Sequence, residues 1–256
     1  MSQQYILIDR TPSVCTITLN REDKRNAFCN AMSHEVMQAM EEAVATKCQA
    51  LVIRAHATAS VWSSGHDLSE ISRLSDLVHD SMFQLFQKLL ESPIPIICAV
   101  DGDVYAGGFL ITLLSDIVIA TERSRFCMTI NKMGIPLPTY CYQFAMQVLG
   151  MHKAKEMFFT ARLMAAEDVY ANGLINHVVK NNSEMEETVH ALVHEIGECN
   201  PEGVAHTKFI MNALTQHAPD SETKQKLDQR FQQLMDSPSI MKRVTLLLEK
   251  IGRHKS

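Results

Sequence analysis

Short apolar runs alternate with helical patterns along the first half of the chain, and this alternation restricts the possible folds most strongly. Residues 50–53, 96–100 and 116–120 are short and rich in branched side chains, which is typical of buried strands. Between these runs, apolar residues recur at helical spacing over 82–90 and 109–114. Strands that alternate with helices predict an α/β fold.

The two ends of the chain follow different patterns. Residues 6–8 and 14–19 favour extended structure on either side of a turn-prone segment, so they predict a hairpin. From about residue 140 strand patterns nearly vanish and helical patterns dominate. We therefore predict a core over residues 1–195 and a helical region over residues 196–256 that packs on the core or on a neighbouring subunit.

Composition excludes several classes of protein. With 46% hydrophobic residues and a formal net charge of -5, the chain carries no basic excess that would favour nucleic acid or an anionic membrane. No apolar run reaches the roughly 18 residues of a membrane span, and the N-terminus lacks a leader pattern, so a cytoplasmic protein is expected. The 7 cysteines are scattered without a C-x-x-C pair, which indicates reduced thiols.

Two glycine-containing turns stand between a predicted strand and a predicted helix. They are Ser63-Ser64-Gly65-His66-Asp67-Leu68 and Asp101-Gly102 through Ala106-Gly107-Gly108. Small residues let the backbone approach a ligand closely, and the start of a helix presents free N–H groups. Each turn alone is weak evidence for a site, because glycine in such a place usually serves only geometry. Together they could hold one oxygen between them.

The order of several motifs resembles that of the crotonase (enoyl-CoA hydratase/isomerase) superfamily. The motifs are Lys24-Arg25-Asn26-Ala27, Ser64-Gly65-His66-Asp67-Leu68, Asp101-Gly102 through Gly107-Gly108 to Ser115-Asp116, Gly134-Ile135-Pro136, and Phe159-Thr160-Ala161 through Gly173 to Val179. This resemblance covers nearly the whole chain. It implies a spiral core of repeated ββα units with C-terminal helices that form homotrimers, often paired as homohexamers.

The resemblance also implies the shared chemistry of that family. Its members stabilise a thioester enolate between two main-chain N–H groups, which fall here on His66 and Gly107. Removing one such donor costs on the order of two to three powers of ten in rate. The His66 side chain is not needed for this purpose, and it either contacts the reacting acyl group or is merely tolerated.

Coenzyme A is then part of the substrate, and we predict no separate cofactor and no metal. By resemblance, Lys24 is placed near a phosphate of coenzyme A, and Ala27 and Leu68 offer backbone contacts. Lys250 would reach a phosphate, from the same or an adjacent subunit. For each lysine a plain solvated position is an equal alternative. His190 and His194 share a predicted helix face, but no third metal ligand accompanies them.

The chain departs from the hydratase pattern at the positions of the two family glutamates. Aligned without gaps, these positions hold Leu110 and Ile130, which cannot transfer a proton. Decarboxylation of a malonyl-type thioester needs no strong base, and several motifs resemble the methylmalonyl-CoA decarboxylase branch of the superfamily. In that branch a tyrosine follows the Ile-Pro pair. Here Leu137 takes that place, and Tyr140 is the candidate to orient the carboxylate.

Two other functions remain open from the sequence. The chain could bind acyl-CoA without turnover, or it could be a hydratase or isomerase whose acids have moved to Glu70 or Asp103. A serine hydrolase and a nucleotide-binding dehydrogenase are disfavoured, because neither a G-x-S-x-G elbow nor a G-x-G-x-x-G after a strand is present.

Overall fold

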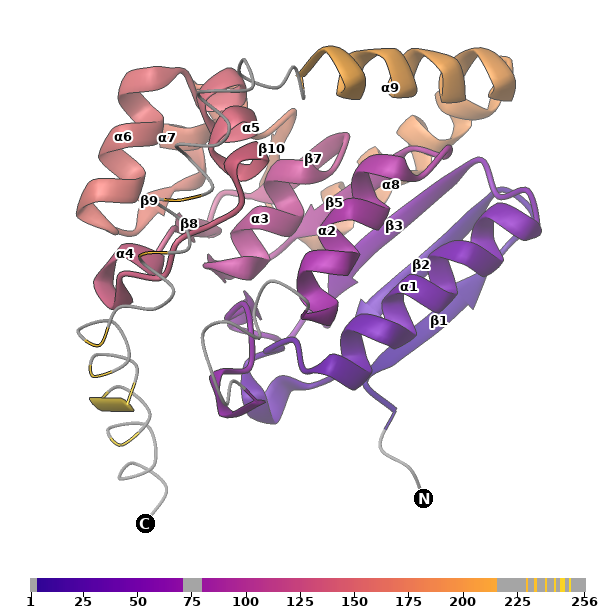
Figure 1. Ribbon diagram of the computed structural model, residues 1–256. Coiled ribbons are helices and arrows are strands. Elements are labelled where there is room, and N and C mark those ends of the chain that lie inside the picture. The colour runs from indigo at the N-terminus through magenta and orange to yellow at the C-terminus, as the bar shows by residue number, and fades with distance from the viewer. Residues whose placement is uncertain are drawn as a thin grey trace.

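Two β-sheets and the helices around them form the molecule in Figure 1. The computed structural model describes residues 4–70 and 80–215, with single positions between 229 and 249. The strands are β1 (Ile6–Arg10), β2 (Val14–Leu19), β3 (Ala50–Ala55), β4 (Val61–Ser63), β5 (Ile96–Val100), β6 (Asp103–Tyr105), β7 (Ile117–Thr121), β8 (Arg125–Cys127), β9 (Met164–Ala165) and β10 (His177–Val179). The helices are α1 (Asn30–Ala45), α2 (Ser81–Glu91), α3 (Gly107–Leu114), α4 (Ile130–Met133), α5 (Thr139–Leu149), α6 (Met151–Thr160), α7 (Ala166–Tyr170), α8 (Asn182–Gly197) and α9 (Pro201–Thr215).

The larger sheet has six strands in the order β1-β2-β3-β5-β7-β10. β1 and β2 pair antiparallel, which confirms the predicted hairpin. The remaining pairs are parallel. Parallel strands need crossover connections, and the helices between them supply these connections.

Helices cover both faces of the larger sheet, as Figure 1 shows with α1, α2 and α3 on one side and α8 on the other. Successive side chains of a strand point to opposite faces. On β3, Leu51 and Ile53 pack in the cluster that contains α1, α2 and α3. Ala50 and Val52 pack instead with Met185, Val189 and Val193 of α8. Residues 50–53 of this strand are therefore apolar on both faces.

The smaller sheet has the order β4-β6-β8-β9. Within the described ranges, the sets β3-β4-α2, β5-β6-α3 and β7-β8-α4 each give one strand to either sheet and then a helix. This is the repeated ββα arrangement expected of the fold. β4, β6 and β8 run parallel, so their carboxyl ends meet at one edge. The turns that follow them, at residues 64–67, 106–107 and 128–130, lie at this edge and build the candidate site.

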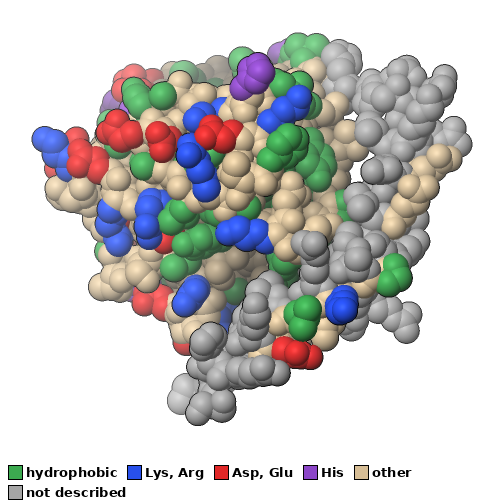
Figure 2. Space-filling model, turned by 90° about the vertical axis from the view of Figure 1, so that its left-hand side faces the viewer, with side chains coloured by type: hydrophobic (Ala, Val, Ile, Leu, Met, Phe, Trp, Pro, Cys, Tyr) green, Lys and Arg blue, Asp and Glu red, His purple; other side chains and the backbone are tan. Residues whose placement is uncertain are grey.

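Helices follow the sheets toward the end of the chain. α9 is joined to the larger sheet by Lys208, whose ammonium lies 2.7 Å from the Asp116 carboxylate and donates to the Ile94 carbonyl at 3.2 Å. The face that carries α4, α6 and α7 shows both acidic and basic side chains, with no field of one sign (Figure 2). Among residues 4–70 and 80–215, no helix combines the length and apolarity needed to cross a membrane.

Most predicted elements are present, and the differences involve short segments. The smaller sheet was not predicted, because strands of two or three residues show no measurable alternation. β10 was also not predicted, because helical patterns dominate the sequence after residue 140. α1 begins at Asn30, and Cys29 occupies its cap position without a side-chain hydrogen bond. The part of the predicted helical region that follows residue 215 lies outside the continuous described ranges.

Candidate active site

The turn after β4 directs the His66 N–H away from Phe28, the residue that pairs with this turn. Phe28 pairs with this turn as a single parallel bridge: its N–H donates to Gly65 at 2.7 Å and its carbonyl accepts from Asp67 at 2.9 Å. Neighbouring peptide groups of an extended chain point to opposite sides. The His66 N–H therefore points to the other side, where the start of α3 lies.

Gly107 opens α3 directly beside this turn. A Cβ placed on Gly65 would lie 2.7 Å from the Gly107 nitrogen, and one placed on Gly107 would lie 3.4 Å from the His66 nitrogen. Gly65 has φ +89°, a conformation that glycine adopts without strain. Within the described residues, neither the His66 nor the Gly107 N–H donates a hydrogen bond. Two free main-chain donors thus lie side by side.

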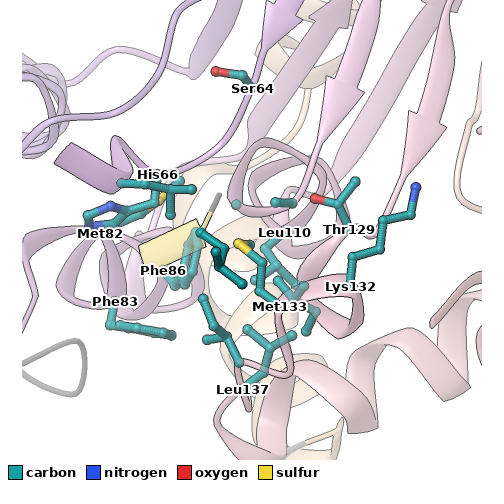
Figure 3. A pocket seen from close by; sticks show the side chains of 16 residues that line it. Ser64, His66, Met82, Phe83, Phe86, Leu110, Thr129, Lys132, Met133 and Leu137 are labelled. Carbon is teal, nitrogen blue, oxygen red and sulfur yellow. The ribbon is translucent and has the colours of Figure 1, made fainter. Parts of the chain in front are cut away.

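Both N–H groups belong to residues that line one cavity of about 510 Å³. Its walls are mainly apolar. The described lining consists of Ser64, His66, Leu68, Met82, Phe83, Phe86, Ala106, Gly107, Leu110, Thr129, Ile130, Lys132, Met133, Ile135, Leu137 and Leu246. Figure 3 shows Leu110, Met133 and Leu137 gathered together, whereas the Lys132 side chain extends away from them. Such a cavity suits an acyl chain with few polar contacts.

Leu110 and Ile130 both lie in this wall, with 1% and 5% of their surface exposed. Leu110 is in the first turn of α3, and Ile130 begins α4. No aspartate or glutamate is among the described lining residues. Leu110 and Ile130 therefore line the cavity, and neither side chain can transfer a proton.

The His66 imidazole is held by Asp80, a residue to which the sequence analysis gave no role. His66 Nε2 lies 2.8 Å from Asp80 Oδ1, and both side chains are nearly buried. The same Oδ1 accepts from the Met82 N–H at 2.8 Å and caps α2. Burial alone would raise the Asp80 pKa, but the bonds from His66 and Met82 outweigh burial and leave this pKa below its usual value.

Tyr140 is the second residue of α5. It is not among the described residues that line the cavity, which include Leu137 instead. Its ring packs against the main core, and burial raises the pKa of its hydroxyl. Gln87 of α2 lies close to that hydroxyl. The predicted contact between Tyr140 and a substrate carboxylate therefore has no support from the cavity lining.

The turn predicted to contact coenzyme A lies next to His66. Ser64 N–H donates to the Arg25 carbonyl at 2.9 Å, and the Ser64 hydroxyl approaches the Lys24 carbonyl at 3.5 Å. Lys24 is half-buried, Ala27 is buried, and Leu68 lines the cavity. Of these residues only Leu68 is in the described lining, Lys24 is linked to it through Ser64, and Lys250 falls outside the described residues.

Asn26 holds this turn in place, and the sequence analysis quoted it without assigning it a function. It is fully buried and has φ +49°, in the left-handed region that asparagine tolerates. Its side chain accepts from the Arg21 N–H at 2.9 Å and donates to the Trp62 carbonyl at 3.1 Å. A lone asparagine in a polar turn gives no signal of such burial, so only the folded chain reveals this role.

The acids suggested as relocated hydratase groups lie elsewhere. Glu70 accepts from the Asn30 N–H at 2.6 Å on an exposed surface. Asp103 pairs with Arg125 at 2.7 Å and accepts from the Tyr105 hydroxyl at 2.9 Å. Neither acid is in the described cavity lining. Likewise, no cluster of three or more potential metal ligands occurs within the described part of the chain.

Comparisons with known proteins agree with this geometry. Residues 9–254 match the family described as enoyl-CoA hydratase/isomerase. The chain is 29% identical to methylmalonyl-CoA decarboxylase of Escherichia coli over 254 residues, which cover 98% of this chain and 97% of that protein. A solved methylmalonyl-CoA decarboxylase in complex with 2-nitronate-propionyl-CoA superposes with a TM-score of 0.91 at 28% identity, covering 97% of both chains.

Hydratases are also among the relatives. The 2,3-dehydroadipyl-CoA hydratase of Escherichia coli is 28% identical over 183 residues, which cover 71% of each protein. The family match spans nearly the whole chain and both turns that carry the free N–H groups. The chain therefore belongs to the enoyl-CoA hydratase/isomerase family, the crotonase group of acyl-CoA enzymes.

Proposed function

We propose that this protein removes carbon dioxide from a malonyl-type thioester of coenzyme A, with methylmalonyl-CoA or a close analogue as substrate. The observation that carries the proposal is the apolar wall of the cavity at Leu110 and Ile130, with no acid in the described lining. Hydration requires groups that deliver and remove protons at water and carbon. Decarboxylation does not require a base, because the electron pair that forms the enolate comes from the bond between the α-carbon and the carboxylate and not from removal of a proton.

The reaction begins when the bond between the α-carbon and the carboxylate carbon breaks. The electron pair of that bond moves into the thioester, which becomes an enolate, and carbon dioxide departs. The negative charge that develops on the thioester oxygen is stabilised by the N–H groups of His66 and Gly107. A proton from solvent then adds to the α-carbon, so that methylmalonyl-CoA plus one proton yields propionyl-CoA and carbon dioxide.

The apolar wall favours this reaction in a second way. A carboxylate that leaves water for apolar surroundings loses hydration, whereas neutral carbon dioxide loses little. Leu110, Ile130 and Leu137 are all nearly inaccessible to solvent. A carboxylate placed against these side chains is destabilised relative to the transition state, in which its charge has moved toward the N–H groups. Binding energy of the coenzyme A portion supplies the cost of that placement.

The coenzyme A portion is assigned to the other side of the two turns. Lys24 provides a cation, and Ala27 and Leu68 provide backbone groups near the mouth of the cavity. Lys250 is proposed as a further phosphate contact. Tyr140 stays a prediction as the residue that orients the carboxylate, and Leu137 is the side chain that faces the cavity at that end.

Similarity to methylmalonyl-CoA decarboxylase supports this choice of reaction, since both the sequence and the superposed structure match over nearly full length. Hydratase relatives support the alternative of an enoyl-CoA hydratase or isomerase. That alternative requires acids in the cavity, and Glu70 and Asp103 are engaged elsewhere. A protein that binds acyl-CoA without turnover is the second alternative.

A single set of incubations separates the three functions. The purified protein is incubated with methylmalonyl-CoA, malonyl-CoA and crotonyl-CoA, and both carbon dioxide and thioester products are measured, with heat-inactivated protein as the control. We expect carbon dioxide and propionyl-CoA from methylmalonyl-CoA. Conversion of crotonyl-CoA alone would instead identify a hydratase. Tight binding of every thioester with no product would identify a binding protein and end the decarboxylase proposal.

A further inference from the structure

The imidazole of His66 has a partner arrangement that its main-chain role does not require. Its Nε2 is bonded to Asp80, while its Nδ1 is buried and has no hydrogen-bond partner in the described part of the chain. A merely tolerated side chain at the rim of a cavity would face the solvent or the substrate. This one is instead directed into a contact between two elements, the turn after β4 and the first turn of α2.

Asp80 connects His66 to the other half of the site. Its Oδ1 accepts from both His66 Nε2 and the Met82 N–H, each at 2.8 Å. The Met82 side chain in turn lies against Gly107, since a Cβ on Gly107 would come within 2.4 Å of the Met82 methyl carbon. Contacts thus run in a closed ring from His66 through Asp80 and Met82 to Gly107, and back to the His66 nitrogen.

Such a ring matters because main-chain donors act only when they are placed accurately. A catalytic group must be held within about half an ångström of its productive position. β4 has only three residues, and its pairing with β6 is irregular in register. The short strand alone fixes the His66 turn weakly. The Phe28 bridge holds the main chain on one side, and the Asp80 contact holds the side chain on the other.

We propose that the hydrogen bond between the His66 imidazole and Asp80 positions the His66 N–H against the thioester oxygen, so that Asp80 is a positioning residue of the reaction. This inference rests on the proposed function, because it assumes a thioester oxygen between His66 and Gly107. It assigns a purpose to the His66 side chain. Through Asp80, which caps α2, the start of this helix helps to position the His66 N–H, although Asp80 does not touch the substrate.

The test uses variants that break the contact while retaining its surroundings. Asp80→Ser keeps a residue that caps helices well but is too short to reach the imidazole. His66→Ala keeps the main-chain N–H and removes the imidazole. We expect each variant to lower kcat for methylmalonyl-CoA by about tenfold with KM changed less than threefold, because the contact matters most as charge develops. The double variant should be no slower than either single variant, since both changes break one contact.

A matched control replaces a helix cap that has no link to the cavity. Asn181 caps α8 by accepting from the Glu184 N–H at 3.1 Å. Asn181→Ser should leave kcat unchanged, and its melting temperature calibrates the effect of a serine cap. If Asp80→Ser keeps kcat within twofold, the positioning proposal is wrong. Additive losses in the double variant would also contradict it, because His66 and Asp80 would then act separately.

A binding measurement judges the proposal even if no thioester is turned over. Propionyl-CoA has a carbonyl oxygen, whereas S-propyl-CoA, its thioether analogue, has none. The ratio of their dissociation constants reports the contribution of the two N–H groups. We expect this ratio to shrink several-fold in Asp80→Ser and in His66→Ala, but not in Asn181→Ser. An unchanged ratio would overturn the positioning role, whereas absence of carbon dioxide release by the unmodified protein would overturn only the proposed function.

Discussion

Adjacent glycines at the start of α3 have different physical reasons for lacking a side chain. A Cβ on Gly107 would meet only the flexible end of Met82, and it would approach the His66 nitrogen to 3.4 Å. A Cβ on Gly108 would come within 2.8 Å of the Ser63 Cβ and 3.0 Å of the Ser63 carbonyl oxygen. Ser63 is fully buried in β4. Gly107 therefore keeps the space between the N–H groups open, and Gly108 allows α3 to pack on the smaller sheet.

Substitution of these glycines should separate activity from stability. Gly107→Ala should lower kcat on the order of a hundredfold, because the added methyl group narrows the space for the thioester oxygen. Its melting temperature should change little, since Met82 can move aside. Gly108→Ala should lower the melting temperature by several degrees through overpacking. Thermal unfolding and steady-state kinetics of both variants provide the check, and equal loss of stability in the two would contradict this division.

Ile130 provides a second prediction at the scale of one residue. Glutamate at this position would place a carboxylate in an apolar wall, so burial would raise its pKa above the unfolded value of about 4.3. A raised acid pKa means that the folded state binds more protons than the unfolded state. The free energy of unfolding should therefore fall as pH rises from about 4 toward neutrality, by about 2 kcal/mol relative to Ile130→Leu.

Urea unfolding of Ile130→Glu and Ile130→Leu at pH 4 and pH 7 measures this difference. Decarboxylation by the glutamate variant should also be slower at pH 7, because its charge repels the substrate carboxylate. The leucine variant keeps the volume and apolar character of the site and should retain activity. Equal pH dependence in both variants would show that residue 130 does not stay within the wall.

At the scale of elements, Asp101 joins the end of β5 to the end of β7 and the start of α8. Its carboxylate accepts from the Thr121 hydroxyl at 2.7 Å, from Arg123 Nε, and from Asn182 Nδ2 at 2.6 Å. Burial by itself would raise the Asp101 pKa, but the bonds from Arg123, Thr121 and Asn182 together hold this pKa below its usual value. The site turns at residues 102–107 begin from this anchored point.

Asp101→Asn should destabilise the protein in a pH-dependent manner. A lowered acid pKa stabilises the fold above the unfolded value of about 3.9, and this stabilisation is lost as pH falls through the lower folded pKa. We expect the variant to lose about 2 kcal/mol in the free energy of unfolding at pH 7. The gap between variant and unmodified protein should narrow below pH 4 in urea titrations. A gap that stays constant with pH would mean that the charge of Asp101 contributes nothing.

Elements also mark where sequence reasoning succeeds and where it stops. β3, β5 and α2 were predicted within one or two residues, because their apolar periodicity extends over five or more positions. β4 and β6 contain three residues each and carry no periodicity, yet they hold both turns of the site. Resemblance of motifs placed His66, Gly107, Leu110 and Ile130 in one region, and the cavity contains all of them.

Residues that act through tertiary contact could not be found in this way. Asp80 lies fourteen positions after His66, and nothing in the local pattern links the two side chains. Asn26 and Trp62 meet only because the Lys24 turn crosses over β4. Tyr140 stays a prediction. It was favoured because it lies near the expected position in sequence, and Leu137, three residues earlier and before the start of α5, lines the cavity.

At the scale of the whole molecule, α9 presents an apolar surface to solvent. Phe209, Met211 and Leu214 are 68%, 64% and 59% exposed within the described chain, and Ile210 is 40% exposed. Large apolar side chains grouped on one helix mark surfaces that associate. The expected homotrimer or homohexamer would cover this helix, because closed symmetric assemblies repeat one such contact in every subunit. The Lys208 and Asp116 pair joins α9 to the larger sheet.

Oligomerisation through α9 leads to a prediction about mass and activity together. The unmodified protein should elute at a multiple of its 28.8 kDa chain mass, as a trimer or a pair of trimers. Replacing Phe209 and Met211 with glutamate should lower that mass, because buried like charges oppose the contact. Light scattering after size exclusion measures the change, and Glu202→Gln on the same helix is the control that should keep the assembly.

If the double variant dissociates but retains kcat, α9 contributes only to assembly. If it dissociates and KM for the thioester rises several-fold, a neighbouring subunit contributes to the coenzyme A site, as expected if Lys250 reaches across. An assembly unchanged by both substitutions would place the subunit contact on another surface.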